Sequence, residues 1–246
     1  KGSIAAIDLR DKLYVKVKGI NIIYPLGRYA DLTGASYCTL EDILMDKINK
    51  EQGITLGTYG TPENVETSYN KILRCKIHGY PKYTGDVALE TLSIFGGNKV
   101  HSNLVEDCEI INADHVAINL KGAGHPNKAI GPNHNIIRLC TVSNPLHHSL
   151  QESYGAHSNL YELNHILQSG DGKSPENDGE GIHLAPLNSI FRFNTIESSG
   201  STDSSRLESG IGLSWNKLRE KFYFAGNNKF YNNNIVNNRG SGIGIS

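Results

Sequence analysis

The stretch NLVEDCEI at residues 103–110 recurs in altered form throughout this chain of 246 residues. Its other copies are NKILRCKI at 70–77, NIIRLCTV at 135–142, NLYELNHI at 159–166, SIFRFNTI at 189–196 and NKFYNNNI at 228–235. The third place is apolar or aromatic in every copy, and the eighth is Ile or Val. The sixth place holds Cys in the first three copies along the chain and Asn in the last three. Such one-dimensional repetition is typical of a solenoid.

A second short motif accompanies these copies and predicts a further strand in each repeat. It reads GITL at 53–56, DVAL at 86–89, HVAI at 115–118, GIHL at 181–184, GIGL at 210–213 and GIGI at 242–245. Such alternation directs two side chains inward and their neighbours outward. Because the repeats differ in length, strands joined by variable loops fit them better than helices do. The one stretch with helical spacing is LEDILMDKINKEQG at 40–53, where we expect a short helical excursion.

Together, the two motifs resemble the repeat of the right-handed parallel β-helix in the pectin-lyase-like superfamily. The resemblance extends over about 13–246 and implies an all-β fold, a single-stranded right-handed parallel β-helix (solenoid) of about seven to eight rungs. Because the repeat crosses every plausible boundary, we expect 1–246 to form a single parallel β-helix domain. The chain stops within the strand-like GIGIS, so we expect it to be part of a longer chain.

Composition excludes several classes of protein. The chain has 24 Lys and Arg against 25 Asp and Glu, a formal net charge of −1. Nucleic-acid-binding domains are usually strongly basic, so we expect no nucleic-acid partner. No apolar run is long enough to span a bilayer, so we expect no membrane span.

The four cysteines and three of the asparagines are predicted to form one structural column. Three of the cysteines occupy the sixth place and the fourth fits a weaker repeat, which favours small buried hydrophobic side chains over disulfides or metal ligands. The column comprises Cys38, Cys75, Cys108, Cys140, Asn164, Asn194 and Asn233. Stacked amides satisfy one another and the turn backbone. We expect a parallel stack of the third-place rings of Tyr161, Phe191 and Phe230 beside it.

The outward positions of the second motif bring polar residues together from distant parts of the sequence. Aligning its copies places Asp86, His115, His147 and Gly181 in one column. The next column holds Ala117, Ser149 and His183, and a third holds Glu90, Asn119 and Gln151. His148 is expected to point inward. A solvated polar strand face is the alternative to a functional site here.

Two neighbouring loops extend this candidate site. The acidic GDGKSPENDGEG at 170–181 offers oxygen ligands that suit a calcium cofactor, but it lacks the spacing of an EF-hand, so the sequence favours a flexible acidic turn over calcium. The stretch SWNKLREKFYF at 214–224 combines aromatic rings with cations, which suits sugars that carry carboxylates. The metal, if any, is unknown from sequence.

The resemblance implies action on polysaccharides, and uronate-containing ones above all. A lyase needs a base, here His115 or His147, and a cation that neutralises the sugar carboxylate, here Lys121 or Arg219. We expect the catalytic residues to be His115, His147, Lys121, Glu152, Glu180 and His183. We expect substrate binding by Asp86, Glu90, Asn119, Gln151, Trp215, Lys217 and Arg219.

The leading hypothesis is an extracellular polysaccharide-degrading enzyme, a lyase acting by β-elimination on an anionic polysaccharide. It would be secreted, periplasmic or on the cell surface. One alternative is a glycoside hydrolase that uses two of Glu90, Glu152 and Glu180. The other is a non-catalytic carbohydrate-binding or tailspike-like surface coil. The NTD, DD and GHG motifs of polygalacturonases are absent from the sequence.

Overall fold

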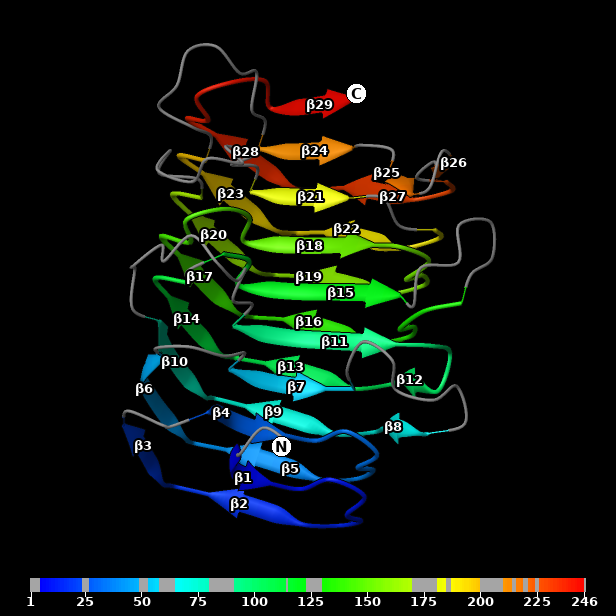
Figure 1. Cartoon of the computed structure of the whole chain (residues 1–246). Coiled ribbons are helices and arrows are strands. Elements are labelled where there is room, and N and C mark those ends of the chain that lie inside the picture. Colours follow the sequence, from blue (N-terminus) through cyan, green and yellow to red (C-terminus); the bar gives the residue numbers. More distant parts are fainter. Residues whose placement is uncertain are drawn as a thin grey trace.

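In the computed structural model, the described part of the chain is built of short parallel strands stacked into long sheets, as in a parallel β-helix (Figure 1). The structure describes residues 5–23, 27–48, 53–57, 65–79, 91–113, 115–122, 130–169, 181–184, 187–199, 210–213, 216–218, 221–223 and 226–245. Those residues contain no helix. The expected all-β class and the stacked parallel strands are confirmed.

Three sheets form the walls of the coil. The first sheet has the order β1 (Ala5–Asp8), β4 (Arg28–Asp31), β7 (Ile54–Leu56), β11 (Leu92–Gly96), β15 (Ile118–Gly122), β18 (Leu150–Ser153), β21 (Ile182–Leu184), β24 (Ile211–Leu213) and β29 (Ile243–Ile245). The second has the order β2 (Lys16–Lys18), β5 (Thr39–Glu41), β9 (Lys71–Leu73), β13 (Leu104–Glu106), β16 (Ile136–Arg138), β19 (Leu160–Glu162), β22 (Ile190–Arg192) and β27 (Lys229–Tyr231). The third has the order β3 (Asn21–Ile23), β6 (Leu44–Ile48), β10 (Lys76–Gly79), β14 (Glu109–Ile111), β17 (Thr141–Ser143), β20 (His165–Leu167), β23 (Thr195–Glu197) and β28 (Asn234–Val236).

Two smaller pairs of strands complete the described structure. They are the parallel pair β8 (Thr67–Ser68) and β12 (Val100–His101), and the antiparallel pair β25 (Asn216–Leu218) and β26 (Lys221–Tyr223). Figure 1 shows the three long sheets running the length of the molecule, so residues far apart in the sequence meet on neighbouring strands.

The repeat predicted the core positions correctly. The third place of each copy lies mid-strand in the second sheet, where Val105 pairs in register with Ile72 and Ile137. The eighth place lies mid-strand in the third sheet, where Ile110 pairs with Ile77 and Val142. These six side chains are fully buried. The expected aromatic stack is present, since the ring centroids of Tyr161 and Phe191 are 4.5 Å apart and those of Phe191 and Phe230 are 4.9 Å apart.

The sixth place forms the predicted interior column. Asn164 Nδ2 donates to Asn194 Oδ1 at 3.0 Å, and Asn194 Nδ2 donates to Asn233 Oδ1 at 2.9 Å. Each amide also donates to a strand carbonyl, such as that of Tyr161, so turn and strand groups inside the coil are satisfied. The four cysteines are free and buried, as expected from their places in the column.

The first place forms a second amide ladder that the repeat alignment did not reveal. Asn70 Nδ2 donates to Asn103 Oδ1, and Asn103 Nδ2 to Asn135 Oδ1, both at 3.0 Å. Asn135 Nδ2 continues the ladder to Asn159 Oδ1 at 3.1 Å. The next copy has Ser189, whose shorter side chain has no amide to continue it.

A left-handed corner residue precedes each ladder residue. Ser102, Asp107 and Asn112 have φ of 55°, 54° and 55°, and they recur at every fifth position. The same spacing returns in later repeats, for example at Ser158, Leu163 and Gln168. This left-handed backbone conformation is energetically unfavourable for most residue types other than Gly, and Asn and Asp tolerate it best among them. Each corner turns the chain from one sheet into the next.

Two sequence-based expectations were wrong. Where we expected a helical excursion at 40–53, residues 40–48 instead contribute to strands β5 and β6, because Leu40 and Met45 are needed in the core and are fully buried there. Residues 49–52 lie outside the described part of the chain. The strand expected at 115–118 begins later, as β15, where Ile118 and Leu120 supply the alternating apolar pair. In the preceding repeat the strand is β11, and 86–89 lie outside the described residues.

Candidate functional site

Four histidines meet on the outer side of the first sheet. His115 precedes β15, His147 and His148 precede β18, and His183 lies within β21. The ring centroids of His115 and His147 are 4.5 Å apart and stacked. Those of His147 and His148 are 3.8 Å apart, and those of His148 and His183 are 4.6 Å apart and stacked. We call this group the imidazole stack.

The backbone between the turn and the strand directs these rings outward. Ser149 is buried, with its hydroxyl oxygen 2.5 Å from that of Ser169, and Leu150 lies in the apolar core. His148 lies instead against His183, whose strand neighbours Ile182 and Leu184 also point into the core. The expectation that His148 points inward was therefore wrong.

A column of polar side chains continues from the stack across the first sheet. In the observed register, His183 pairs with Gln151, and Gln151 pairs with Asn119. The sequence alignment paired Gln151 with Asn119 correctly but placed His183 two positions away, beside Ser149. That error came from starting β15 and β18 too early. Gln151 and His183 are half-buried, whereas Asn119 is fully buried.

His147 is buried in an unusual setting. Its side chain is 5% exposed, and neither ring nitrogen has a hydrogen-bond partner within the described part of the chain. Burial, together with the nearby imidazoles of His115 and His183, lowers its pKa from 6.5 to about 3. His147 therefore stays neutral near pH 7.

Lys121 lies on the same sheet as the stack. It is half-buried on β15, beside Ser153 in register, and its ammonium nitrogen is 4.8 Å from the ring centroid of Tyr154. A cation over an aromatic face keeps its charge and is held in place. The predicted cation of the site therefore shares the sheet face with Asn119 and Gln151.

Glu152 does not belong to this face, although the sequence predicted it as a catalytic residue. It is fully buried and pairs in register with Leu120 and Leu184, both core residues. Strand alternation explains this, because Glu152 follows the outward Gln151 by one residue.

The buried carboxyl of Glu152 joins the two residues between which the first-place amide ladder is interrupted. Its Oε1 accepts hydrogen bonds from Asn159 Nδ2 at 2.7 Å and Ser189 Oγ at 2.9 Å. The buried hydroxyl of Tyr161 also interacts with this carboxyl group. Burial raises the pKa of Glu152 to about 7, although the hydrogen bonds from Asn159 and Ser189 oppose the rise. The signal missed in the sequence was the substitution of Ser for Asn at 189.

Several predicted site residues lie outside the described residues. These are Asp86, Glu90, Glu180, Trp215 and Arg219, together with the acidic loop at 170–181 except Gly181. Lys217 lies in β25, but its side chain is not described. Among the side chains that the structure does describe, no cluster of three or more His, Cys, Asp or Glu has the geometry to hold a metal ion.

The sequence finds no match among known proteins in two comparisons. No protein family model matches it, and no curated protein matches it either. Within the described residues, no helix is long and apolar enough to cross a membrane.

Proposed function

We propose that this protein cleaves a uronate-containing polysaccharide by β-elimination at the imidazole stack. The observation that supports this most is the gathering of four histidines from three successive turns of the coil beside Asn119, Gln151 and Lys121. That set combines imidazole bases, amide donors and one cation. A substrate carboxylate and its acidic neighbouring proton need these three kinds of group.

In this proposal His183 is the base. It is half-buried at the edge of the imidazole stack, whereas His147 and His148 are almost fully buried. His183 takes the proton next to the sugar carboxylate, and the electron pair expels the glycosidic oxygen at the neighbouring carbon. Because the pKa of His147 is lowered to about 3, His147 adds no competing positive charge.

The amide and ammonium groups stabilise the charge that develops on the carboxylate. Gln151 lies next to His183 in register, so its amide meets the same part of a bound sugar. Lys121 supplies positive charge further along the sheet. Removing one such donor typically costs a factor of about 10² or more in rate.

The hydrolase alternative receives less support. It needs two carboxyl groups that face each other across the sugar, about 5 to 9.5 Å apart. Glu152 is unavailable because it lies in the core, and Glu90 and Glu180 lie outside the described residues.

A non-catalytic carbohydrate-binding coil is the second candidate. The burial of Asn119, His147 and His148 favours it, because buried groups have little contact with a polymer at the surface. Under either proposal we place the fold in the right-handed, pectin-lyase-like class. Either function requires export to the cell surface, periplasm or medium.

The test is incubation of the protein with a panel of uronate polysaccharides while ultraviolet absorbance from unsaturated sugar ends is followed. His183→Ala should lower kcat/KM by about 10² or more. The matched control is His165→Ala, because His165 is half-exposed on the third sheet and pairs with Glu197 at 3.0 Å. Equal activities of the two variants would rule out His183 as the base. Sugar binding without cleavage across the panel would favour the non-catalytic candidate.

A further inference from the structure

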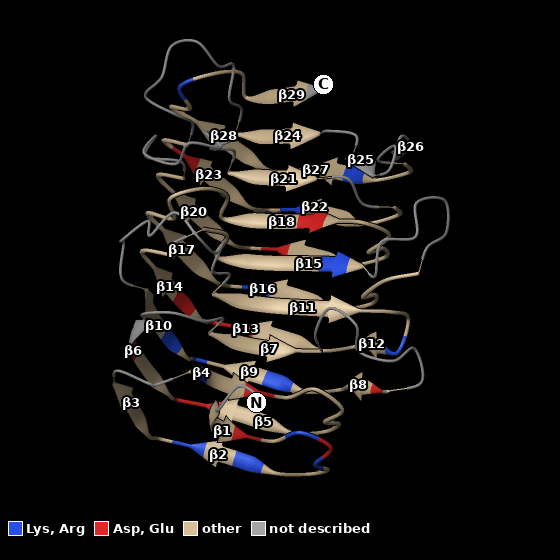
Figure 2. Cartoon of the chain, viewed as in Figure 1, with Lys and Arg blue, Asp and Glu red and all other residues tan. Residues whose placement is uncertain are grey.

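The outer face of the second sheet carries three parallel rows of side chains on β13, β16, β19 and β22. Successive strands of this sheet carry alternating basic and acidic residues in Figure 2. The aliphatic row consists of Leu104, Ile136, Leu160 and Ile190. The charge row consists of Glu106, Arg138, Glu162 and Arg192. The corner row consists of the exposed Leu139, Leu163 and Phe193.

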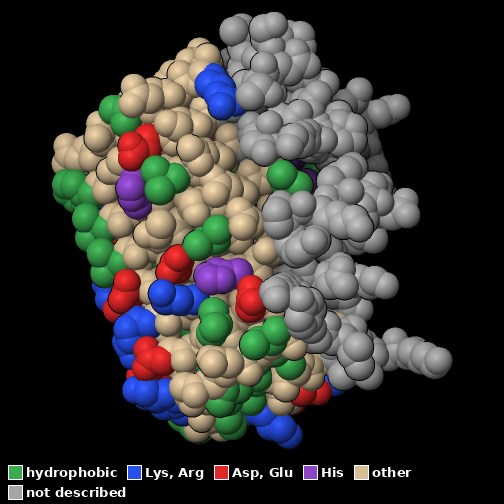
Figure 3. Space-filling view, turned by 90° about the vertical axis from the view of Figure 1, so that its left-hand side faces the viewer, with side chains coloured by type: hydrophobic (Ala, Val, Ile, Leu, Met, Phe, Trp, Pro, Cys, Tyr) green, Lys and Arg blue, Asp and Glu red, His purple; other side chains and the backbone are tan. Residues whose placement is uncertain are grey.

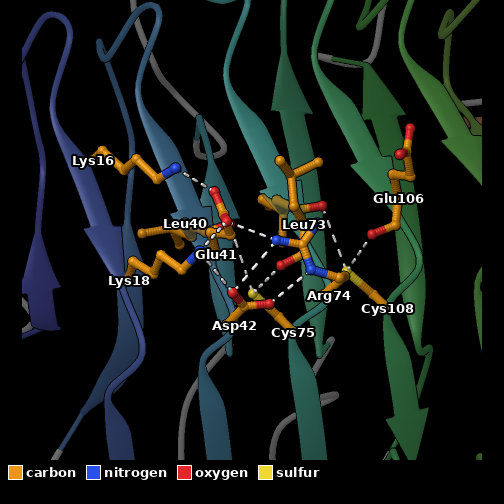
Figure 4. A network of polar contacts seen from close by, with 11 residues as sticks. Lys16, Lys18, Leu40, Glu41, Asp42, Leu73, Arg74, Cys75, Glu106 and Cys108 are labelled. Atoms are coloured by element: carbon orange, nitrogen blue, oxygen red, sulfur yellow. Dashed lines mark hydrogen bonds and ion pairs between the residues drawn. The ribbon is translucent and has the colours of Figure 1, made fainter.

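The charge row is an ordered ladder. Arg138 Nε donates to Glu106 at 2.6 Å, and Arg192 Nε donates to Glu162 at 2.8 Å. A longer contact of 4.0 Å joins Arg138 to Glu162. A similar network of Lys18, Glu41, Asp42 and Arg74 lies nearer the start of the chain (Figure 4). The charges therefore hold fixed positions.

The corner row exposes apolar residues where the fold does not need them. Leu139, Leu163 and Phe193 are 47%, 50% and 46% exposed, all with φ near +56°. The equivalent corners in other repeats hold Asp107 and Asn232, residue types that tolerate this backbone better. Bulky apolar side chains at exposed, strained positions mark an interaction surface. In Figure 3 hydrophobic side chains follow one another along the left edge of the third-sheet side.

We propose that this face binds a second copy of the chain about a two-fold axis that lies along the strand direction between β16 and β19. That axis reverses the order of the strands and keeps each row opposite itself. Glu106 then faces Arg192 of the second copy, and Arg138 faces Glu162.

The same axis matches the aliphatic row and the two central corner residues, whereas Phe193 faces Asp107 of the second copy. Ile136 faces Leu160 of the second copy, and Leu139 faces Leu163. The interface thus has an apolar surface on either side of a line of complementary charges, a composition that suits protein–protein contacts.

The alternating charges also select one alignment of the two copies. Sliding the second copy by one strand, about 4.8 Å, moves the axis by half that distance onto β16 and sets Glu106 against Glu162 and Arg138 against itself. A face-to-face dimer in which both copies keep the same strand order would also place like charges opposite one another. Like-charge contacts suppress wrong alignments.

The first test compares Leu163→Asn with Tyr69→Asn by sedimentation equilibrium. Both residues are exposed corner residues at positive φ, with exposures of 50% and 43%, but Tyr69 lies at a different corner. Asn suits that backbone, so both variants should fold. Wild type and Tyr69→Asn should form dimers of twice 26.9 kDa, and Leu163→Asn should raise the dimer dissociation constant at least about tenfold. A monomeric wild type, or equal constants for the two variants, would overturn the proposal.

The second test inverts the charge row with Glu106→Arg, Arg138→Glu, Glu162→Arg and Arg192→Glu in one variant. The inverted row keeps its internal alternation and remains complementary to itself, so the variant should dimerise. It should not pair with wild type, because every facing charge is then alike. Mixed dimers at the statistical fraction would refute the proposed alignment. If circular dichroism shows that this variant is unfolded, the Leu163→Asn comparison decides.

Discussion

Replacing Glu152 by Gln should remove a pH-dependent loss of stability from the core. Gln keeps the size of the side chain and an oxygen acceptor for Asn159 and Ser189, which lie at 2.7 and 2.9 Å from Glu152 Oε1. It cannot ionise. The substitution therefore isolates the cost of the buried charge from the hydrogen bonds that join the ladder across Ser189.

The magnitude follows from the raised pKa. In the unfolded chain Glu152 ionises near its ordinary value of 4.5, whereas in the folded protein its pKa is about 7. Between these values the folded state binds more protons, so its stability falls as pH rises. One pKa unit corresponds to about 1.4 kcal/mol, so wild type should lose about 3 kcal/mol from this group between pH 4.5 and pH 8.

The assay is urea unfolding of wild type and Glu152→Gln at pH 5 and pH 8. The free energy of unfolding of the variant relative to wild type should be about 2.5 kcal/mol higher at pH 8 than at pH 5. Glu109→Gln is the control, because Glu109 is a surface residue paired with Lys76 at 3.1 Å. This substitution should change the difference in unfolding free energy between pH 5 and pH 8 by less than about 1 kcal/mol. A pH-independent effect of Glu152→Gln would refute the reasoning.

Three further predictions concern the core and the imidazole stack. Asn194→Ala removes hydrogen bonds to Asn164, Tyr161 and Asn233 and should cost about 3 kcal/mol in urea unfolding, whereas the exposed Asn234→Ala should cost less than about 0.5 kcal/mol. Thiol reagents should leave the native protein unmodified and label all four cysteines in urea, because all four are buried when folded. The neighbouring thiol of Cys108 and burial both raise the pKa of Cys75. Rapid labelling of the native protein would contradict this prediction. Because the pKa of His147 is about 3 in the folded protein, the stability of wild type should fall as the pH falls from 6.5 towards 3. This dependence of stability on pH should be weaker in His147→Gln. An equal dependence in the variant would contradict the prediction.

The repeat in the sequence was enough to predict the interior of the coil. Places such as Val105 and Ile110 are fixed by apolar character at constant spacing, and neighbouring strands pair them in register. The column of Cys108 and Asn164 followed from the same spacing. These positions are predictable because burial permits few residue types there.

The outer face was harder to predict because nothing in the sequence marks where a strand begins after a loop. HVAI at 115–118 fits the strand pattern as well as the true start at Ile118 does, and the two-residue error displaced His183 from Gln151. Glu152 was misplaced for another reason. An acidic residue is assumed to be outside, and only the bonds to Asn159 and Ser189 show how it is accommodated in the core.

The left-handed corners have a consequence for how this protein tolerates changes in length. Because Ser102, Asp107 and Asn112 recur at every fifth position, each strand between them has one permitted length. A single inserted residue would move a ladder amide away from its hydrogen-bond partner and place the following side chains on the opposite face of the sheet. Foreign peptides should therefore be grafted outside the corner-to-corner segments. There the natural repeats already differ in length, so the coil can serve as a scaffold for inserted peptides.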